Sequence, residues 1–408
     1  MLLGRIVEEV VRTDGRRVLA GLIRLTGDFD AAEDALQEAY ARALKVWHRD
    51  GVPATPGAWL NTVARRIAID RLRRPPHSPL PDDVEAPALE LEPEPAHEIE
   101  DDRLRLLFTC CHPALAPDAQ CALALRTLGG LTTREIARGF VEPESTTAQR
   151  LVRAKRKIRE AGIPYEVPAL ARLPERIDTV LGVLYLIFNE GYAATDDDSL
   201  LRPNLVAEAI RLARLSVDLL PADAEVRGLL ALMLLTDARR AARTTVGGDL
   251  VPLDDQDRSL WNREQIAEGV RILDEALALR RPGPYQTQAA IAALHSTATT
   301  AAETDWRQIC ALYEALLRQS PSPIVELNLA VAVGMSHGLR HALDGIARVE
   351  ASGDLDRYYL LPAAKADVLR RLGHPADAAE AYRVALGLVT NAAERRYLER
   401  RLAECTPR

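Results

Sequence analysis

The sequence predicts an all-α protein with several helical domains. Apolar residues recur at helical spacing in segment after segment, and no run alternates between apolar and polar residues as a half-buried strand would. The chain has 408 residues, a length that predicts roughly two to four domains. Because 48% of its residues are hydrophobic, it can also bury substantial cores.

Charge is distributed unevenly along the chain, which is acidic overall with a net charge of −7. Residues 1–74 hold 13 basic and 10 acidic residues, a net +3, and residues 103–162 hold 11 and 5, a net +6. Residues 75–102 hold ten acidic residues, seven prolines and no Lys or Arg, so they have little to bury and read as a linker. A nucleic-acid partner would therefore have to meet the two basic modules.

Three helices are predicted in the first module, at Ile6–Thr26, Asp30–Trp47 and Pro56–Arg74. Asp30 and Glu33 have the spacing of a capping box, which would start the second of these helices. Proline suits the first turn of the third.

The third of these helices has two faces. Leu60, Val63 and Ile67 form an inward stripe, and Trp59 could pack in the core or stack against an unpaired base. The other face carries polar side chains: Asn61, Thr62, Arg65, Arg66, Asp70 and Arg73. By itself this pattern is as typical of an ordinary surface helix as of one that binds nucleic acid.

The second module has the sequence pattern of a helix-turn-helix. Its expected helices are Asp102–Cys111, Pro117–Thr127, Thr132–Phe140 and Pro143–Ala161. Thr132 with Glu135 forms a capping box at the third helix, and the segment from Gly139 to Pro143 breaks the chain before the fourth.

The fourth helix is amphipathic and basic. Thr147, Leu151, Ala154 and Ile158 fall on one stripe and should pack inward. The outward face carries side chains that can reach base edges and phosphates: Ser145, Thr146, Gln149, Arg150 and Arg153. Break, caps and charge together favour DNA binding, whereas charge alone would fit a solvated basic helix.

The remainder of the chain, 174–408, is predicted to be an α-solenoid of paired helices. Gly373, Ala378 and Tyr382 fit the latter part of a tetratricopeptide unit, and Ala342 and Ile309 recur 36 and then 33 residues earlier. Such arrays bind a peptide or protein on their concave face, and the alternative is an irregular helical domain without a partner.

Metal sites and enzyme chemistry are not expected. Cys110, Cys111 and Cys121 lack the spaced pairs of closed zinc sites, so they are interpreted as small core residues, with redox or metal sensing left open. The sequence has no phosphate loop, nucleophile elbow or HExxH motif, so no catalytic residue and no cofactor is predicted. Without a signal peptide or a membrane-spanning apolar run, the protein is expected to be cytoplasmic, with no membrane partner.

The order of these motifs resembles a known family. The stretch AAEDALQEAYARAL, then AWLNTVARRIAIDRLRR, the acidic linker, LTTREIARGF and RLVRAKRKIR is similar to the extracytoplasmic-function (ECF) sigma factors of bacterial RNA polymerase, over about Leu3–Ile163. The later stretches LYLIFNEGY and GPYQTQAAIAALH resemble a subgroup with a tetratricopeptide-like (TPR-like) extension. The resemblance implies sigma region 2 at 1–74, an acidic linker at 75–101, sigma region 4 at 102–164 and a TPR-like regulatory domain at 174–408.

The resemblance also implies partners and contact residues. By position, the helix that would bind core RNA polymerase carries Ala32, Glu33, Asp34, Gln37 and Glu38. The segment that would open and read the minus-ten element of promoter DNA carries Trp59, Asn61, Arg65, Arg66, Asp70 and Arg73, although the family often has Asn where this chain has Arg66. The minus-thirty-five reader would use Thr133, Ser145, Thr146, Gln149, Arg150, Arg153 and Lys155.

The expected function is that of a sigma factor that binds core polymerase, directs it to promoters and helps melt them. By resemblance, the acidic linker would thread through polymerase channels; the alternative is a soluble spacer kept open by self-repulsion. The C-terminal domain would regulate activity by folding back on the sigma domains or by binding a signalling protein or peptide. Two other interpretations are a one-component DNA-binding transcription regulator with a helical-repeat sensor and, more remotely, a helical scaffold.

Overall fold

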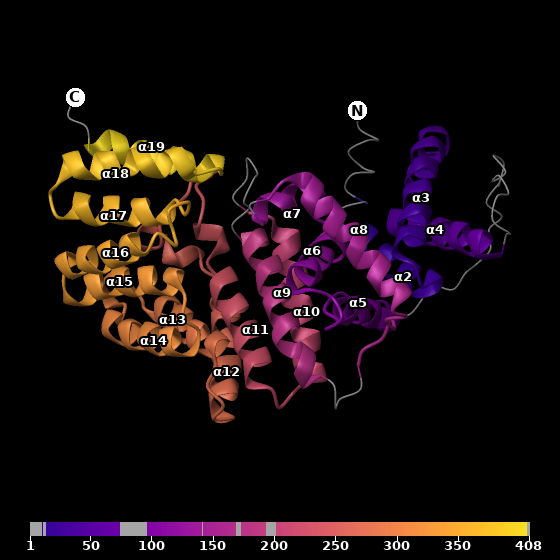
Figure 1. Cartoon of the computed structure of the whole chain (residues 1–408), viewed down its shortest axis with the longest axis horizontal. Coiled ribbons are helices and arrows are strands. Elements are labelled where there is room, and N and C mark those ends of the chain that lie inside the picture. Colours follow the sequence, from indigo (N-terminus) through magenta and orange to yellow (C-terminus); the bar gives the residue numbers. More distant parts are fainter. Residues whose placement is uncertain are drawn as a thin grey trace. The chain divides into compact units, whose positions relative to one another are not determined.

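The computed structural model confirms the all-α prediction. It describes residues 10, 14–73, 96–140, 142–168, 173–192 and 201–405, and among these the regular elements are helices, apart from one isolated β-bridge between Thr244 and Leu250. The chain divides into two compact units, Met1–Leu186 and Ile187–Arg408 (Figure 1). No helix in the described part of the chain is long and apolar enough to cross a membrane.

The first module contains α2 (Gly15–Thr26), α3 (Phe29–Asp50) and α4 (Pro56–Arg73). The expected start of α2 at Ile6 lies outside the described residues. Helix α4 begins at Pro56 as predicted, but the capping box expected at the start of α3 is wrong. Asp28 is the N-cap instead, because its backbone is extended (φ −136°, ψ 127°) and its carboxylate accepts from the N–H groups of Asp30 and Ala31.

These three helices pack around a small apolar core. Leu22 on α2, Leu36 on α3 and Leu60 on α4 are all buried. Trp47 near the end of α3 is also buried, and Trp59 packs against it edge to face with ring centroids 5.3 Å apart. The polar faces of α3 and α4 thereby remain at the surface of the module.

The second module contains α5 (Ala96–Cys110), α6 (Pro117–Thr127), α7 (Thr133–Gly139) and α8 (Glu144–Glu160). Helix α5 begins six residues before the predicted start at Asp102, within the segment expected to be linker, whose residues up to 95 lie outside the described part. The predicted capping box at α7 is confirmed. Glu135 N–H donates to Thr132 Oγ1 (3.2 Å), and Thr132 N–H donates to Glu135 Oε2 (2.6 Å).

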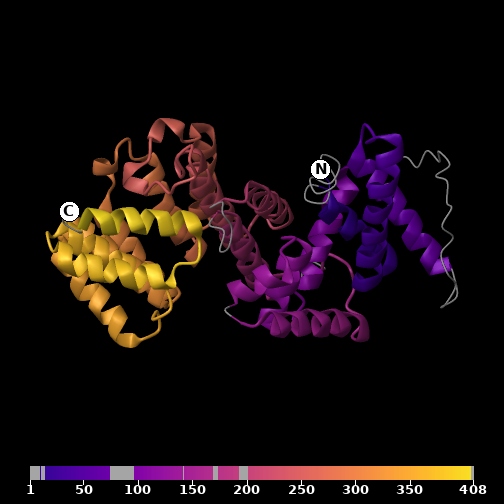
Figure 2. The ribbon, with the colours of Figure 1, turned by 90° about the horizontal axis from the view of Figure 1, so that it is seen from above.

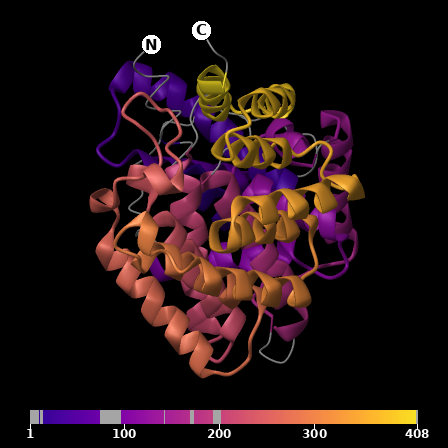
Figure 3. The ribbon, with the colours of Figure 1, turned by 90° about the vertical axis from the view of Figure 1, so that its left-hand side faces the viewer.

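The second unit is a succession of antiparallel helices. Helix α9 (Pro174–Tyr192) spans the boundary between the units. The helices that follow it are α10 (Pro203–Leu219), α11 (Ala224–Asp237), α12 (Arg263–Ala278), α13 (Pro284–Thr297), α14 (Trp306–Gln319), α15 (Pro323–His337), α16 (Leu339–Ser352), α17 (Leu360–Arg371), α18 (Pro375–Leu388) and α19 (Ala392–Cys405). Helices α14 to α19 lie one above another in Figure 1, and Figures 2 and 3 show the same orange-to-yellow part of the chain from two other sides.

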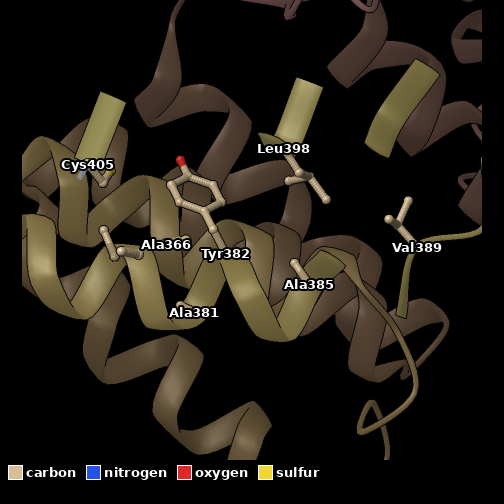
Figure 4. Close-up of a cluster of buried hydrophobic side chains, with 9 residues drawn as sticks. Ala366, Ala381, Tyr382, Ala385, Val389, Leu398 and Cys405 are labelled. Atoms are coloured by element: carbon tan, nitrogen blue, oxygen red, sulfur yellow. The ribbon is translucent and has the colours of Figure 1, made fainter. Parts of the chain in front are cut away.

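The repeat positions read from the sequence occupy alternate helices of this stack. Ile309, Ala342 and Ala378 lie on α14, α16 and α18, and each is fully buried. Tyr382 is the largest fully buried side chain and lies at the centre of the core cluster between α17, α18 and α19, beside Ala366 (Figure 4). These small and aromatic side chains let successive hairpins pack closely.

Candidate nucleic-acid interface

Helix α8 has the two faces that its sequence predicts. Thr147, Leu151, Ala154 and Ile158 are buried against the second module. Among the expected DNA-reading side chains, Ser145, Gln149 and Arg153 are exposed, while Thr146 and Thr133 are half-buried. The N-terminal half of α8 therefore presents a polar surface to solvent.

Arg150 is held by neighbours within the second module. Its guanidinium donates to both carboxylate oxygens of Glu142 and lies over the Phe140 ring, 5.0 Å from the centroid. The hydrogen bond from Arg150 holds the pKa of Glu142 below its usual value. Only 18% of the Arg150 side chain is exposed. Arg150 therefore stabilises the turn that precedes α8 and contributes only a small part of the exposed surface of this helix.

The C-terminal half of α8 contacts the first module. Lys155 Nζ lies 2.8 Å from Glu33 Oε1 and 3.2 Å from Asp30 Oδ1, and 12% of its side chain is exposed. Arg159, one turn further along, lies 3.1 Å from Asp30 Oδ2 and 3.3 Å from Asp28 Oδ2. An expected DNA contact, Lys155, thus binds an expected polymerase contact, Glu33.

The remaining expected polymerase contacts lie along α3. Gln37 and Asp34 are exposed, and Arg71 of α4 pairs with Glu38 (2.8 Å) and Asp34 (3.7 Å). Ala32 is fully buried, so its side chain packs inside the module and offers no surface to a partner. The physical reason is its position on the apolar stripe of α3, with Ala35 and Ala39.

The residues expected to contact the minus-ten element all lie along α4. Asn61, Arg65, Arg66 and Asp70 are half-buried, and Arg73 is exposed. The Trp59 ring packs on Trp47, as the first of its two interpretations expects. The side chain is only half-buried, so part of it remains accessible for stacking against a base.

The cysteines of the second module lie where core residues would. Cys110 and Cys111 are fully buried, and Cys110 Sγ lies 3.5 Å from Thr127 Oγ1. Burial raises the pKa of the Cys110 thiol to about 12 and that of Cys111 well above its usual value, which disfavours the reactive thiolate. Cys121 is half-buried.

A polar contact between the modules has no counterpart in the sequence predictions. Asp102 of α5 is 1% exposed and accepts from Arg24 Nε of α2 (3.0 Å) and Arg105 Nη1 (3.0 Å). The Tyr165 hydroxyl lies 2.6 Å from the Asp102 carbonyl and 3.0 Å from the Ala20 carbonyl. No local sequence signal could identify these pairings, since Arg24 and Asp102 are 78 residues apart.

Comparison with known proteins gives these modules a family. Residues 10–75 match the family Sigma-70 region 2, and residues 105–158 match Sigma-70, region 4. The chain is 30% identical to "Probable ECF RNA polymerase sigma factor SigI" of Mycobacterium tuberculosis, over 40% of this chain and 61% of that protein. It is 27% identical to "ECF RNA polymerase sigma factor SigE" of Mycolicibacterium smegmatis, over 38% of this chain and 60% of that protein.

The chain contains sigma regions 2 and 4 and is similar to ECF sigma factors. It also carries a C-terminal extension, part of which, residues 176–277, matches a family of unknown function (DUF6596). Over 95% of its length the chain is 44% identical to "Uncharacterized protein R00370" of Rhizobium meliloti, and the match covers 92% of that protein. Sigma regions 2 and 4 both lie in the first unit, and they support a DNA-binding role in transcription initiation.

Proposed function

We propose that this sigma factor binds core RNA polymerase through α3, directs it to a set of promoters and assists their melting. The observation that carries the proposal is the arrangement of three polar faces, on α3, α4 and α8, within the two segments that match sigma regions 2 and 4. Catalysis of RNA synthesis then belongs to the polymerase.

The polymerase contact is proposed on the carboxylate-rich face of α3. Asp34 and Gln37 are exposed there, and Glu33 and Glu38 are half-buried beside cations of this chain. A basic groove on the polymerase can replace those cations, since charge-assisted hydrogen bonds form equally well with an external Arg or Lys. Ala32 holds this face in place from inside the module.

Promoter DNA is proposed to contact α4 and α8. On α4, Arg65, Arg66 and Arg73 supply positive charge for the phosphates of the minus-ten strand, with Asn61 and Asp70 for base edges and Trp59 for stacking. On the second module, the minus-thirty-five contacts are Thr133, Ser145, Thr146, Gln149, Arg150, Arg153 and Lys155.

The second unit is proposed to regulate this activity through a protein or peptide. Its support is the helical stack of α14–α19 and a cavity of about 500 Å³ between α14, α15 and α16, whose lining is mostly apolar and includes the charged side chains of Glu314, Glu326 and Arg348. Stacked helical hairpins commonly bind partners on such surfaces.

Run-off transcription with purified core polymerase over a library of genomic fragments tests the main proposal. The full chain should produce transcripts from a limited set of promoters, and it should compete with the housekeeping sigma factor for core polymerase in a pull-down assay. Specific DNA binding without core binding would instead indicate a one-component regulator. For the regulatory role, a chain ending at Tyr192 should initiate at a different rate from the full chain, and equal rates with an unchanged response to signal would rule that role out.

A further inference from the structure

The last helix of the chain is bound to a segment that lies between α11 and α12 in the sequence. Arg396 and Arg400 of α19 both contact the Asp249 carboxylate (2.7 and 3.2 Å), and Arg401 contacts Asp255 (3.4 Å). These five residues are called the α19 clasp below. Asp249 and Arg396 are 147 residues apart, and α19 is the last helix of the stack in Figure 1.

The segment that α19 binds is a short hairpin, residues 243–251, which the isolated β-bridge closes. Gly248 turns the chain there with a positive φ of 78°. Arg396 donates to the Gly248 carbonyl (3.2 Å), and Arg400 donates to the Leu250 carbonyl (3.3 Å). Because α19 binds the backbone of the hairpin as well as its carboxylate, it fixes the position of the whole hairpin.

The base of the same hairpin contacts the end of α9. The Arg243 guanidinium lies over the Tyr192 ring, 4.0 Å from its centroid, and donates to the Tyr192 carbonyl. Tyr192 is the last residue of α9, a helix that begins in the first unit. On the other side, the Glu394 carboxylate of α19 attracts the Arg243 guanidinium and accepts a hydrogen bond from the Tyr359 hydroxyl. One arginine thus connects the end of α9 with α19.

We infer that the α19 clasp couples the last helix of the chain to α9, the helix that runs from the first unit into the second. Solenoids of helical repeats are normally open arrays, in which each repeat contacts only its neighbours. The clasp adds a contact between distant parts of the chain, so a change at α19 is transmitted through the hairpin to the end of α9. The clasp can open while the apolar core of the stack stays packed, because its ion pairs are partly exposed and have water and salt as alternatives.

Hydrogen–deuterium exchange of the full-length chain, measured by peptide mass spectrometry, tests this coupling. Asp249→Lys places a cation opposite Arg396 and Arg400 and should open the clasp. Exchange should become about 2- to 30-fold faster, the effect of removing two partly exposed ion pairs. The increase should appear together in the 243–251 hairpin, in α19 and in the last turn of α9. Faster exchange confined to the hairpin would overturn the inference.

Two further variants control for the added charge. Asp344→Lys makes the same change of charge at an exposed acid of α16, which forms no ion pair within the described residues, and all three segments should exchange as in the unmodified chain. The triple variant D249K/R396E/R400E inverts every charge around position 249 and should restore slow exchange. Fast exchange in Asp344→Lys, or in the triple variant, would show that the effect does not come from the clasp.

The consequence for transcription rests on the proposed function, and the two can fail separately. With core polymerase, Asp249→Lys should initiate at a different rate from the unmodified chain, whereas Asp344→Lys and the triple variant should keep the unmodified rate. Equal rates in all four proteins, together with faster exchange in Asp249→Lys, would reject the use of the clasp in regulation. If none of the four initiates, the proposed sigma role fails, and the exchange measurement alone still decides whether α19 is coupled to α9.

Discussion

Helices meet in two different ways in this molecule. In the second unit, α15 and α16 approach so closely that a Cβ added to Gly334 would lie 2.5 Å from the Ala342 Cβ, and one added to Gly345 would lie 2.6 Å from the Ala330 Cβ. In the first unit, the contacts between regions 2 and 4 include a row of ion pairs and a buried carboxylate. Close apolar packing thus joins α15 to α16, whereas charged groups join regions 2 and 4.

The difference indicates which contact can open. The small apolar side chains between α15 and α16 gain no favourable interaction with water when these helices separate. Separation would expose apolar surface and lose dispersion contacts, and both are unfavourable in free energy. The cations and carboxylates of the first unit keep favourable alternatives in water, salt, DNA and polymerase. The second unit is therefore expected to stay assembled while regions 2 and 4 separate.

The largest expected effect lies in the apolar unit. Tyr382→Ala should lower the free energy of unfolding of the second unit by about 3–5 kcal/mol, because a fully buried aromatic ring leaves a cavity. Trp261 and Trp306 report on this unit by fluorescence in a W47F/W59F background. Val384→Ala, on the same helix but exposed, should change little. A similar loss in both variants would contradict the packing shown in Figure 4.

The next largest effect on stability is expected for the buried carboxylate of Asp102. Asp102→Ala should destabilise the first unit by about 1.5–3 kcal/mol, since two guanidinium groups lose a charged hydrogen-bond partner. Urea unfolding followed by Trp47 and Trp59 measures the loss when the tryptophans of the second unit are replaced by Phe. Asp118→Ala, an exposed acid, serves as the control. No difference between them would mean that Asp102 does not hold the modules together.

The helices were predictable from local rules. The proline at the start of α4, the capping box at Thr132 and Glu135, and the buried stripe of α8 depend on residues within one or two turns, and the structure confirms all three. The failure at α3 has the same local origin. Asp30 and Glu33 have the correct spacing, but Asp28 precedes them and caps the helix from two residues earlier.

The contacts between the modules could not be predicted, because they depend on docking. Lys155 and Asp30 are 125 residues apart, and no spacing rule relates them. The sequence predicted an acidic helix face for polymerase and a basic one for DNA as separate surfaces. It contained no sign that the two would pair with each other. Ala32 was placed at a surface because position in a motif does not reveal which side chains turn inward.

Two arginines on α8 separate DNA contact from structural support. Arg153→Ala should weaken binding to a cognate promoter fragment by about 1–3 kcal/mol and leave stability unchanged, because this side chain is exposed. Arg150→Ala should weaken binding and also destabilise region 4, since it removes the contacts to Glu142 and Phe140. Fluorescence anisotropy and urea unfolding measure the two effects. Loss of stability in Arg153→Ala would refute the division.

The smallest expected effect on stability concerns Asp30, which forms ion pairs between regions 2 and 4. Asp30→Asn should lower the stability of the first unit by only about 0.2–1 kcal/mol at low salt, because the Asp30 carboxylate is more than half exposed and its ion pairs are correspondingly weak. The loss should vanish near 1 M salt, where the Debye length falls to about 3 Å, whereas the loss in Tyr382→Ala should persist. Asp118→Asn controls for the helix dipole. A loss of stability at Asp30 that does not depend on salt would contradict an electrostatic contact. Regions 2 and 4 would then be held together by packing, as α15 and α16 are, and salt or a charged partner could not separate them.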